Sequence, residues 1–131
     1  MLSVYTDGAS RGNPGKAASG YIIYKDQKEF CRDFRYIGFA TNNEAEYKAI
    51  IMALEKVKDM DGEVKIFSDS ELVIKQLTGQ YKVREPRLKD LYDMAKDAEK
   101  AFSKISYTHL HREDRIISEV DAGLNKLLDI I

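Results

Sequence analysis

Four acidic residues stand at the points where the hydrophobic pattern of the chain changes. Asp7 and Asp69 each end a short run in which apolar and polar residues alternate, which is typical of a strand. Glu46 lies at the start of a helix-like pattern, and Asp121 at the start of the last one. If these junctions meet in space, four carboxylates converge, and hard divalent cations make such a cluster tolerable at neutral pH. The pattern therefore favours two-metal phosphoryl transfer as the chemistry of the site.

The periodicity along the chain predicts an α/β fold. Alternation indicates strands near residues 2–7, 20–24, 30–36, 64–69 and 105–110. A helical period follows Thr41, Ser70 and Pro86 and returns from Val120 to the end. The first three strands form an antiparallel meander, whereas strand-helix alternation in the second half implies parallel strands. We therefore predict a mixed five-stranded sheet flanked by helices, with its site at the carboxyl ends of the parallel strands.

Each of the four acids also has a structural explanation. Asn43 and Glu46 have the spacing of a capping box. Asp69 is placed to cap the helix after it, and Asp121 to complement a helix dipole. Asp7 and the glycine after it are compatible with a turn that continues as a loop through residue 15. The functional assignment therefore depends on the combination of the four and not on any one of them.

The length and composition of the chain fit a single domain over residues 1–131. With 131 residues and 44% hydrophobic content, the chain can build its own core. No apolar run approaches the roughly 18 residues that span a bilayer, and no secretion signal is visible, so we expect a cytoplasmic protein. Cys31 is the single cysteine, and we expect it to be a buried small hydrophobe without a catalytic role.

The charge balance constrains how the chain could bind a polyanion. A formal net charge of −1 gives little general attraction to nucleic acid, so any such binding must depend on local contacts. The candidate cationic groups are Arg11, Lys16, Lys48, Lys75, Lys82, Arg84, Arg87 and Lys89.

Four segments place the acids in distinctive local contexts. They are residues 7–15 (DGASRGNPG), 41–47 (TNNEAEY), 69–73 (DSELV) and 111–121 (HREDRIISEVD). In this order, and over almost the whole chain, they resemble the type 1 ribonuclease H family in its short single-domain archaeal or bacterial form. Four independent helix caps would not reproduce these sequence motifs around the acids. The resemblance implies the ribonuclease H-like fold, with strand order 3-2-1-4-5.

The resemblance also implies roles for the acids. Asp7 would bridge two Mg²⁺ ions, with Mn²⁺ as an alternative. Glu46 and Asp69 would complete the site for the leaving 3′ oxygen, and Asp121 would help to hold the ion that activates water. His111 matches a histidine that assists proton transfer or product release, although a structural role is equally compatible with its position. His109 is expected to be structural.

The implied substrate is an RNA/DNA hybrid, whose RNA strand would be cut to leave a 3′-hydroxyl and a 5′-phosphate. Double-stranded RNA is a second candidate substrate. Short amides can bond a 2′-hydroxyl or a minor-groove edge without reading sequence. The positions that match substrate contacts of the family are Gly8, Asn13, Thr41, Asn42, Asn43, Ser70 and Glu71. We expect a monomer with no obligate protein partner and no membrane contact.

The chain departs from the family pattern at two positions. Ile117 stands where the family often has an asparagine, so an amide beside the metals is absent, and Glu71 stands where many relatives carry glutamine. Two alternatives therefore stay open. One is another nuclease of the wider superfamily that acts on DNA, and the other is a domain that binds hybrids without cutting them.

Overall fold

The computed structural model describes residues 1–60 and 62–131 of the chain. Within these residues, five strands form one mixed sheet in the order β3-β2-β1-β4-β5. The strands are β1 (Leu2–Ser10), β2 (Gly15–Lys25), β3 (Lys28–Ala40), β4 (Glu63–Ser68) and β5 (Lys104–His109). The strands β1, β2 and β3 are antiparallel neighbours, whereas β4 and β5 run parallel to β1. The predicted α/β fold and its strand order are confirmed.

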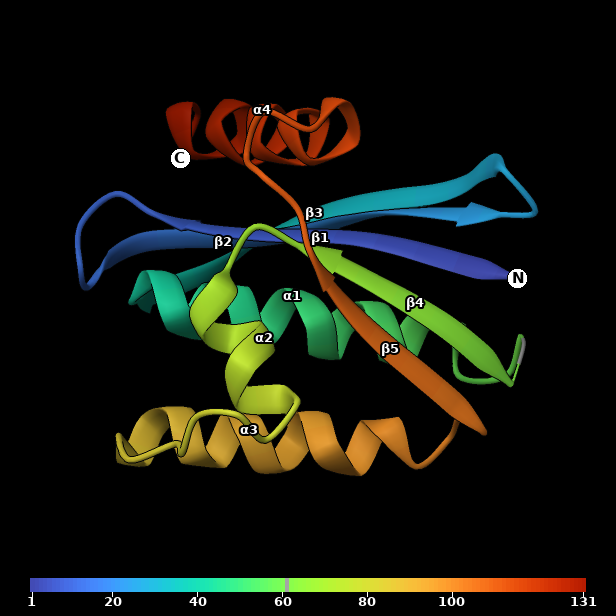
Figure 1. Cartoon of the computed structure of the whole chain (residues 1–131). Helices are drawn as coiled ribbons and strands as arrows, with labels where there is room; N and C mark the ends of the chain where they lie inside the picture. The colour runs from blue at the N-terminus through green and yellow to red at the C-terminus, as the bar shows by residue number, and fades with distance from the viewer. Residues whose placement is uncertain (61) are drawn as a thin grey trace.

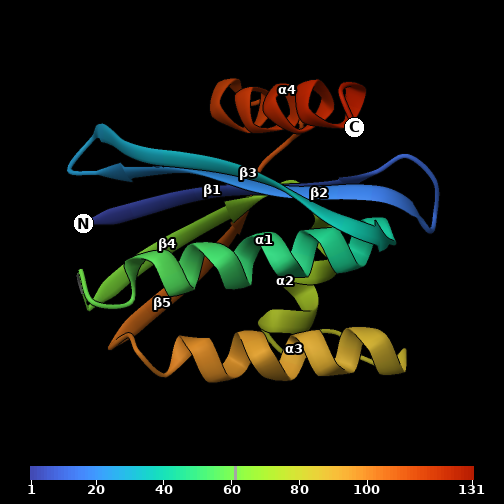
Figure 2. The same ribbon diagram turned by 180° about the vertical axis from the view of Figure 1, so that it is seen from behind.

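Helices cover both faces of the sheet (Figure 1). They are α1 (Asn42–Val57), α2 (Glu71–Leu77), α3 (Pro86–Glu99) and α4 (Arg115–Asp129). Helix α4 lies on one face and α1 on the other, with α3 packed against α1 on the side away from the sheet (Figure 2). Within the described part of the chain, no helix has both the length and the apolar character needed to cross a membrane.

The two faces of the sheet differ in how much apolar surface they bury. On the α1 face, Ile50 and Leu54 are fully buried in a large cluster that includes Ile66 of β4. On the α4 face, Leu124 packs in a smaller cluster around Ile22 of β2. Helix α1 is therefore enclosed between the sheet and α3, whereas α4 rests on the sheet from one side.

The register of the parallel strands brings their carboxyl ends together. Thr6 of β1 lies opposite Ser68 of β4, and Ser68 lies opposite His109 of β5. Asp7 and Asp69 each follow one of these paired residues in sequence. Both aspartates therefore lie at the same end of the sheet, where open α/β sheets usually place their sites.

The loop predicted after Asp7 is shorter than expected. Strand β1 continues to Ser10, and β2 already begins at Gly15, because Gly8 pairs with Ser19 and Ser10 with Ala17. Backbone hydrogen bonds to β2 keep residues 8–10 in the strand, although the local turn residues predict a loop there.

The last helix begins earlier than its apolar pattern indicated. Asp114 caps α4, and its Oδ2 accepts hydrogen bonds from the backbone N–H groups of Ile116 and Ile117 at 3.1 Å each. Asp121 therefore lies inside α4 instead of at its start, and a role for Asp121 at the positive end of the helix dipole is wrong.

Candidate active site

Three of the four predicted carboxylates meet at the carboxyl end of the parallel strands. Asp7 comes from β1, Glu46 from the second turn of α1, and Asp69 from the residue after β4. One carboxylate oxygen from each lies within 4.8 Å of the others. Asp7 and Glu46 are buried, with 3% and 7% of their surface exposed, and Asp69 is half-buried. The site is thus a group of acids set largely below the surface.

A glycine lets helix α1 approach close enough to deliver Glu46. A Cβ atom at Gly8 would lie 2.3 Å from the carbonyl carbon of Ala45 and 2.4 Å from the backbone nitrogen of Glu46. The hydroxyl of Ser19 on β2 fastens the same turn by donating a hydrogen bond to the Ala45 carbonyl at 2.7 Å. The first turns of α1 therefore lie directly on β1 and β2.

The cap of α1 is not the one that its sequence first suggests. Thr41 is the N-cap, its Oγ1 accepts from the Glu44 N–H, and the Glu44 carboxylate accepts from the Thr41 N–H. The alternative in which Asn43 and Glu46 form the capping box is therefore wrong, because the box lies two residues earlier. Glu46 is consequently not used by the cap and points to Asp7.

Asp69 does not cap helix α2 either. The N-cap is Ser70, whose Oγ accepts a hydrogen bond from the Val73 N–H at 3.3 Å. Ser70 itself is positioned by the hydroxyl of Ser68, which accepts from the Ser70 N–H at 3.0 Å. Ser70, predicted to contact substrate, thus also has a structural function that orients the residue before it.

The buried acids strongly disfavour carrying their full charge. Burial, together with the charges of Asp69 and Asp121, raises the pKa of Asp7 to about 8, against the lowering effect of hydrogen bonds from Glu46 and the Gly8 N–H. Burial, followed by the charge of Asp7, raises the pKa of Glu46 well above its ordinary value. The hydrogen bond between the two carboxyl groups lowers the pKa of Asp7 and raises the pKa of Glu46, so the two groups titrate as a pair.

One oxygen of this group lacks a partner within the described residues. Glu46 Oε2 is buried and accepts no hydrogen bond there. A buried carboxylate oxygen normally has a partner, because desolvating a charge without one is unfavourable. Carboxylate oxygens in this arrangement are the ligands that hard divalent cations prefer. Asp7, Glu46 and Asp69 therefore fit a metal site.

Asp121 belongs to the site electrostatically and lies at its edge. Its side chain is exposed on α4 and is outside the three-carboxylate group. Its charge nevertheless contributes to the raised pKa of Asp7. Ile117, one turn earlier, is fully buried, so this side chain serves the core and does not line the acidic site.

The predicted substrate amides form a network between the end of β1 and the start of α1. Asn42 Oδ1 accepts from the Ser10 N–H at 2.8 Å, and Asn13 Oδ1 accepts from the Asn42 N–H at 3.1 Å. Asn13, Thr41 and Asn43 also line a pocket of about 230 Å³ together with Glu85 and Arg87 from the start of α3. The three asparagines thus come together, and Arg87 joins them.

The two histidines lie together at the end of β5. The rings of His109 and His111 are both exposed, with their centroids 5.9 Å apart. The expected structural role of His109 is not supported by burial. Glu71, a predicted substrate residue, is ion-paired with Lys75 at 2.9 Å, and this pairing lowers the pKa of Glu71, with a smaller contribution from His109. The position of His109 at the carboxyl end of a parallel strand is the sequence signal that could have drawn attention to it.

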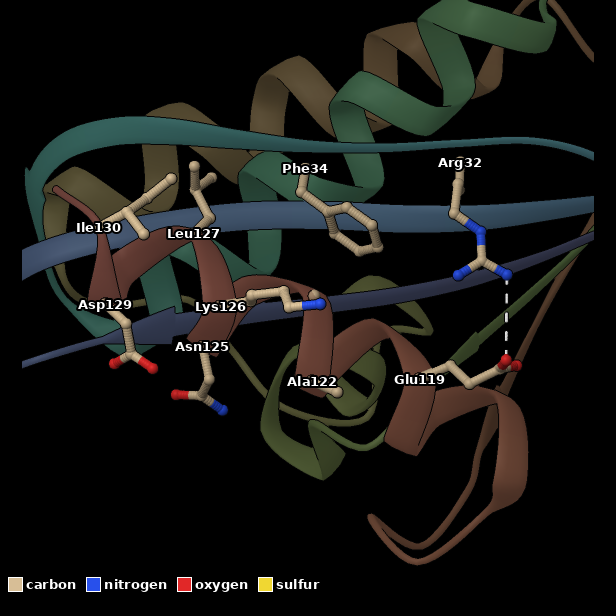
Figure 3. A pocket seen from close by; sticks show the side chains of 10 residues that line it. Arg32, Phe34, Glu119, Ala122, Asn125, Lys126, Leu127, Asp129 and Ile130 are labelled. Atoms are coloured by element: carbon tan, nitrogen blue, oxygen red, sulfur yellow. Dashed lines mark ion pairs between the residues drawn. The ribbon is translucent and has the colours of Figure 1, made fainter.

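A large groove lies elsewhere on the described residues. A groove of about 970 Å³ runs between α4 and β3, and its lining includes Phe34, Leu127 and Ile130 (Figure 3). Its apolar floor has none of the four acids. The candidate active site is therefore defined by its carboxylates and not by this groove.

A mixed sheet with this strand order and a group of buried carboxylates at the ends of its parallel strands defines an α/β protein with an acidic, metal-compatible site. The chain belongs to the RNase H family, and the model of that family matches residues 1–114.

Individual relatives agree with this assignment. The chain is 40% identical over 130 residues to ribonuclease HI of Halobacterium salinarum, and the match covers 98% of this chain and 64% of that protein. A bifunctional protein of Mycobacterium tuberculosis is 35% identical over 112 residues, which are 83% of this chain and 31% of that protein. The chain therefore spans less than two thirds of the length of these curated relatives.

Solved structures show the same fold. RNase H1 of the halophilic archaeon Halobacterium salinarum superposes with a TM-score of 0.93 at 39% identity, covering 99% of this chain and 98% of that one. LC11-RNase H1, solved in complex with an RNA/DNA hybrid, superposes with a TM-score of 0.85 at 36% identity, covering 98% and 99%.

Proposed function

We propose that the chain is an endoribonuclease that hydrolyses the RNA strand of RNA/DNA hybrids and leaves 3′-hydroxyl and 5′-phosphate ends. The observation that carries the proposal is the group formed by Asp7, Glu46 and Asp69, in which a buried Glu46 oxygen lacks a partner within the described residues. This donor set suits Mg²⁺, with Mn²⁺ as a substitute. Two such ions, when bound, supply an activated water and neutralise charge on the leaving oxygen.

The residues of the chain divide into those that would hold the metal ions and one that would transfer a proton. Asp7, with its central position, would contribute to both metal positions, Glu46 and Asp69 to one of them, and Asp121 to the other. His111, exposed on the loop after β5, would accept or return a proton.

The hybrid as substrate is supported by two observations. LC11-RNase H1, similar over nearly the whole chain, was solved with an RNA/DNA hybrid. In this chain, Asn13 and Asn43 line a pocket at the start of α1 together with Arg87. Such amides suit sugar hydroxyls and minor-groove edges, and an arginine suits a phosphate.

A cleavage assay with three matched duplexes tests the proposal. Hybrid, double-stranded RNA and double-stranded DNA of one sequence are incubated with the protein over a Mg²⁺ titration, with Asp7→Asn as the inactive control. We expect cleavage of the RNA in the hybrid, Mg²⁺ dependence, and products that a 3′-hydroxyl-dependent ligase accepts. Preferential cutting of duplex DNA would replace the proposal by a DNA nuclease of the same superfamily.

Binding of the hybrid without any cleavage would indicate a non-catalytic domain. Cutting of double-stranded RNA beside the hybrid would extend the substrate range without changing the chemistry. Asn43→Ala separates recognition from metal binding, because Asn43 lines the pocket and is outside the carboxylate group. We expect weaker cleavage of the hybrid and unchanged Mg²⁺ binding by calorimetry in that variant.

A further inference from the structure

Arg11 joins the loop after β1 to the last helix. Its Nη2 donates to the backbone carbonyl of Asn125 at 3.0 Å and to Asn125 Oδ1 at 3.2 Å, and pairs with Asp129 Oδ1 at 2.7 Å. The side chains of Asn125 and Asp129 leave α4 on the opposite side from Leu127 and Ile130, and all four residues line the groove (Figure 3). The guanidinium predicted to be available for nucleic acid is therefore engaged with α4.

The same loop is also bound to the start of α1. The Ser10 N–H donates to Asn42 Oδ1 at 2.8 Å, and Asn13 Oδ1 accepts from the Asn42 N–H at 3.1 Å. Helices α1 and α4 lie on opposite faces of the sheet (Figure 1). Residues 10–13 consequently connect the two helices that carry Glu46 and Asp121.

The contact on α4 is one helical turn from the fourth acid. Asn125 Nδ2 donates to the backbone carbonyl of Asp121 at 3.1 Å. Asn125, which Arg11 binds, is therefore in direct contact with Asp121, whose charge contributes to the raised pKa of Asp7. Toward the other end of α4, Arg32 approaches Glu119 at 3.9 Å (Figure 3). That distance makes it the weaker of the two attachments.

We propose that Arg11 is a positioning residue, which fastens α4 to the loop carrying Asn13 and so sets the place of Asp121 relative to Asp7. A single exposed ion pair contributes little. Arg11 differs because one nitrogen is shared by three acceptors on two successive turns of α4, which limits sliding and rotation of that helix. The proposal deepens the proposed function and rests on it only for the role of Asp121 in metal binding.

The first experiment measures the metal-free protein and needs no activity. Hydrogen exchange of the backbone amides of residues 122–130 is compared in the parent, Arg11→Met and Arg35→Met. Arg35 is the matched control, because its ion-pair partner Asp33 lies on the same strand and not on α4. We expect exchange in this segment to quicken about twofold to fivefold in Arg11→Met alone. Equal exchange in all three proteins would overturn the proposal.

The second experiment measures the Mg²⁺ concentration that gives half-maximal hybrid cleavage, together with kcat and KM. In Arg11→Met we expect this Mg²⁺ concentration to rise about threefold to tenfold, with kcat at saturating Mg²⁺ largely kept. Asp129→Asn should move it in the same direction, and Arg11→Lys should partly restore it. Arg35→Met should match the parent.

Two results would contradict a positioning role. If KM rose in Arg11→Met with an unchanged Mg²⁺ requirement, and Asp129→Asn lowered KM by freeing the guanidinium, then Arg11 would bind the substrate phosphate directly. An unchanged Mg²⁺ requirement with unchanged KM would reduce Arg11 to a surface ion pair. If the parent does not cleave the hybrid, the proposed function fails, while the exchange experiment still decides whether Arg11 fastens α4.

Discussion

The two faces of the sheet hold their acids in opposite ways. On the α1 face, Glu46 is buried against Asp7, and the helix that carries it is in backbone contact with β1 at Gly8. On the α4 face, Asp121 is exposed and is held through a surface arginine and a small apolar cluster. The buried side thus gives precise placement and high electrostatic strain, whereas the exposed side gives an adjustable charge at little cost in desolvation.

The strongest test of this contrast is to remove one charge from each side. Asp7→Asn keeps the shape of the side chain and removes the charge at the centre of the carboxylate group, so we expect cleavage to fall about a thousandfold or more. Asp121→Asn should reduce cleavage about tenfold to a hundredfold, because Asp121 is exposed and outside the three-carboxylate group. Rates are measured at saturating Mg²⁺. Equal losses would show that the two faces contribute alike.

Two glycines test the difference in packing. Gly8→Ala places a methyl group against the backbone of α1, which cannot move independently, and should lower the free energy of unfolding by about 3 kcal/mol. Gly123→Ala on α4 meets the half-buried ring of Phe34, which is a side chain and not backbone, and it gains helix propensity of about 1 kcal/mol. Its net effect should stay within about 1 kcal/mol. Urea denaturation measures both, and a large loss at Gly123 would show that α4 is fitted as tightly as α1.

The strain on the buried side predicts an unusual pH dependence in the absence of metal. The pKa of Asp7 is raised from 3.8 to about 8 in the folded protein, so the folded state keeps a proton that the unfolded chain releases. This contribution to stability is complete below about pH 4 and is lost as the pH rises through about 8.

Urea denaturation in EDTA across this range should show stability that declines with pH. The decline should be shallower in Asp7→Asn and, in the parent, shallower with Mg²⁺ present. Asp121→Asn is the control from the exposed side and should keep most of the slope. A slope that is the same in Asp7→Asn as in the parent would contradict the assignment of the strain to the buried pair.

The smallest expected effect compares the two helix caps. Thr41→Ala and Asp114→Ala each remove a side-chain acceptor from the first turn of α1 or α4, and each should lower stability by about 1 kcal/mol. Cleavage should suffer more from Thr41→Ala, because Glu46 lies in the second turn of α1, whereas Asp121 lies well inside α4. If Asp114→Ala impaired cleavage more, then the α4 side would be the more sensitive one.

Much of the fold could be predicted from the sequence, because alternation and helical periodicity are local properties. All five strands overlap their predicted ranges, and α3 begins at Pro86, where the helical period was expected. Errors occurred where strand pairing or capping overrode local residue preferences. Gly8 pairs with Ser19 instead of opening a loop. Asp114 caps a helix that begins at Arg115, although the apolar pattern indicated a helix only from Val120.

The sequence by itself determined which residues could form the site. Four acids at the ends of periodic segments, together with the short sequence motifs that surround them, indicated the family that comparison with known proteins confirms. These features are encoded in neighbouring residues, so they are readable without a structure.

Only the tertiary structure decided how those residues meet. It assigned the cap of α1 to Thr41 and Glu44, freed Glu46 for the site, and left Asp121 exposed at its edge. It also showed that Arg11 is engaged by α4. Spacing along the chain cannot give these results, because they depend on which distant backbones come into contact and on how much water each carboxylate loses there.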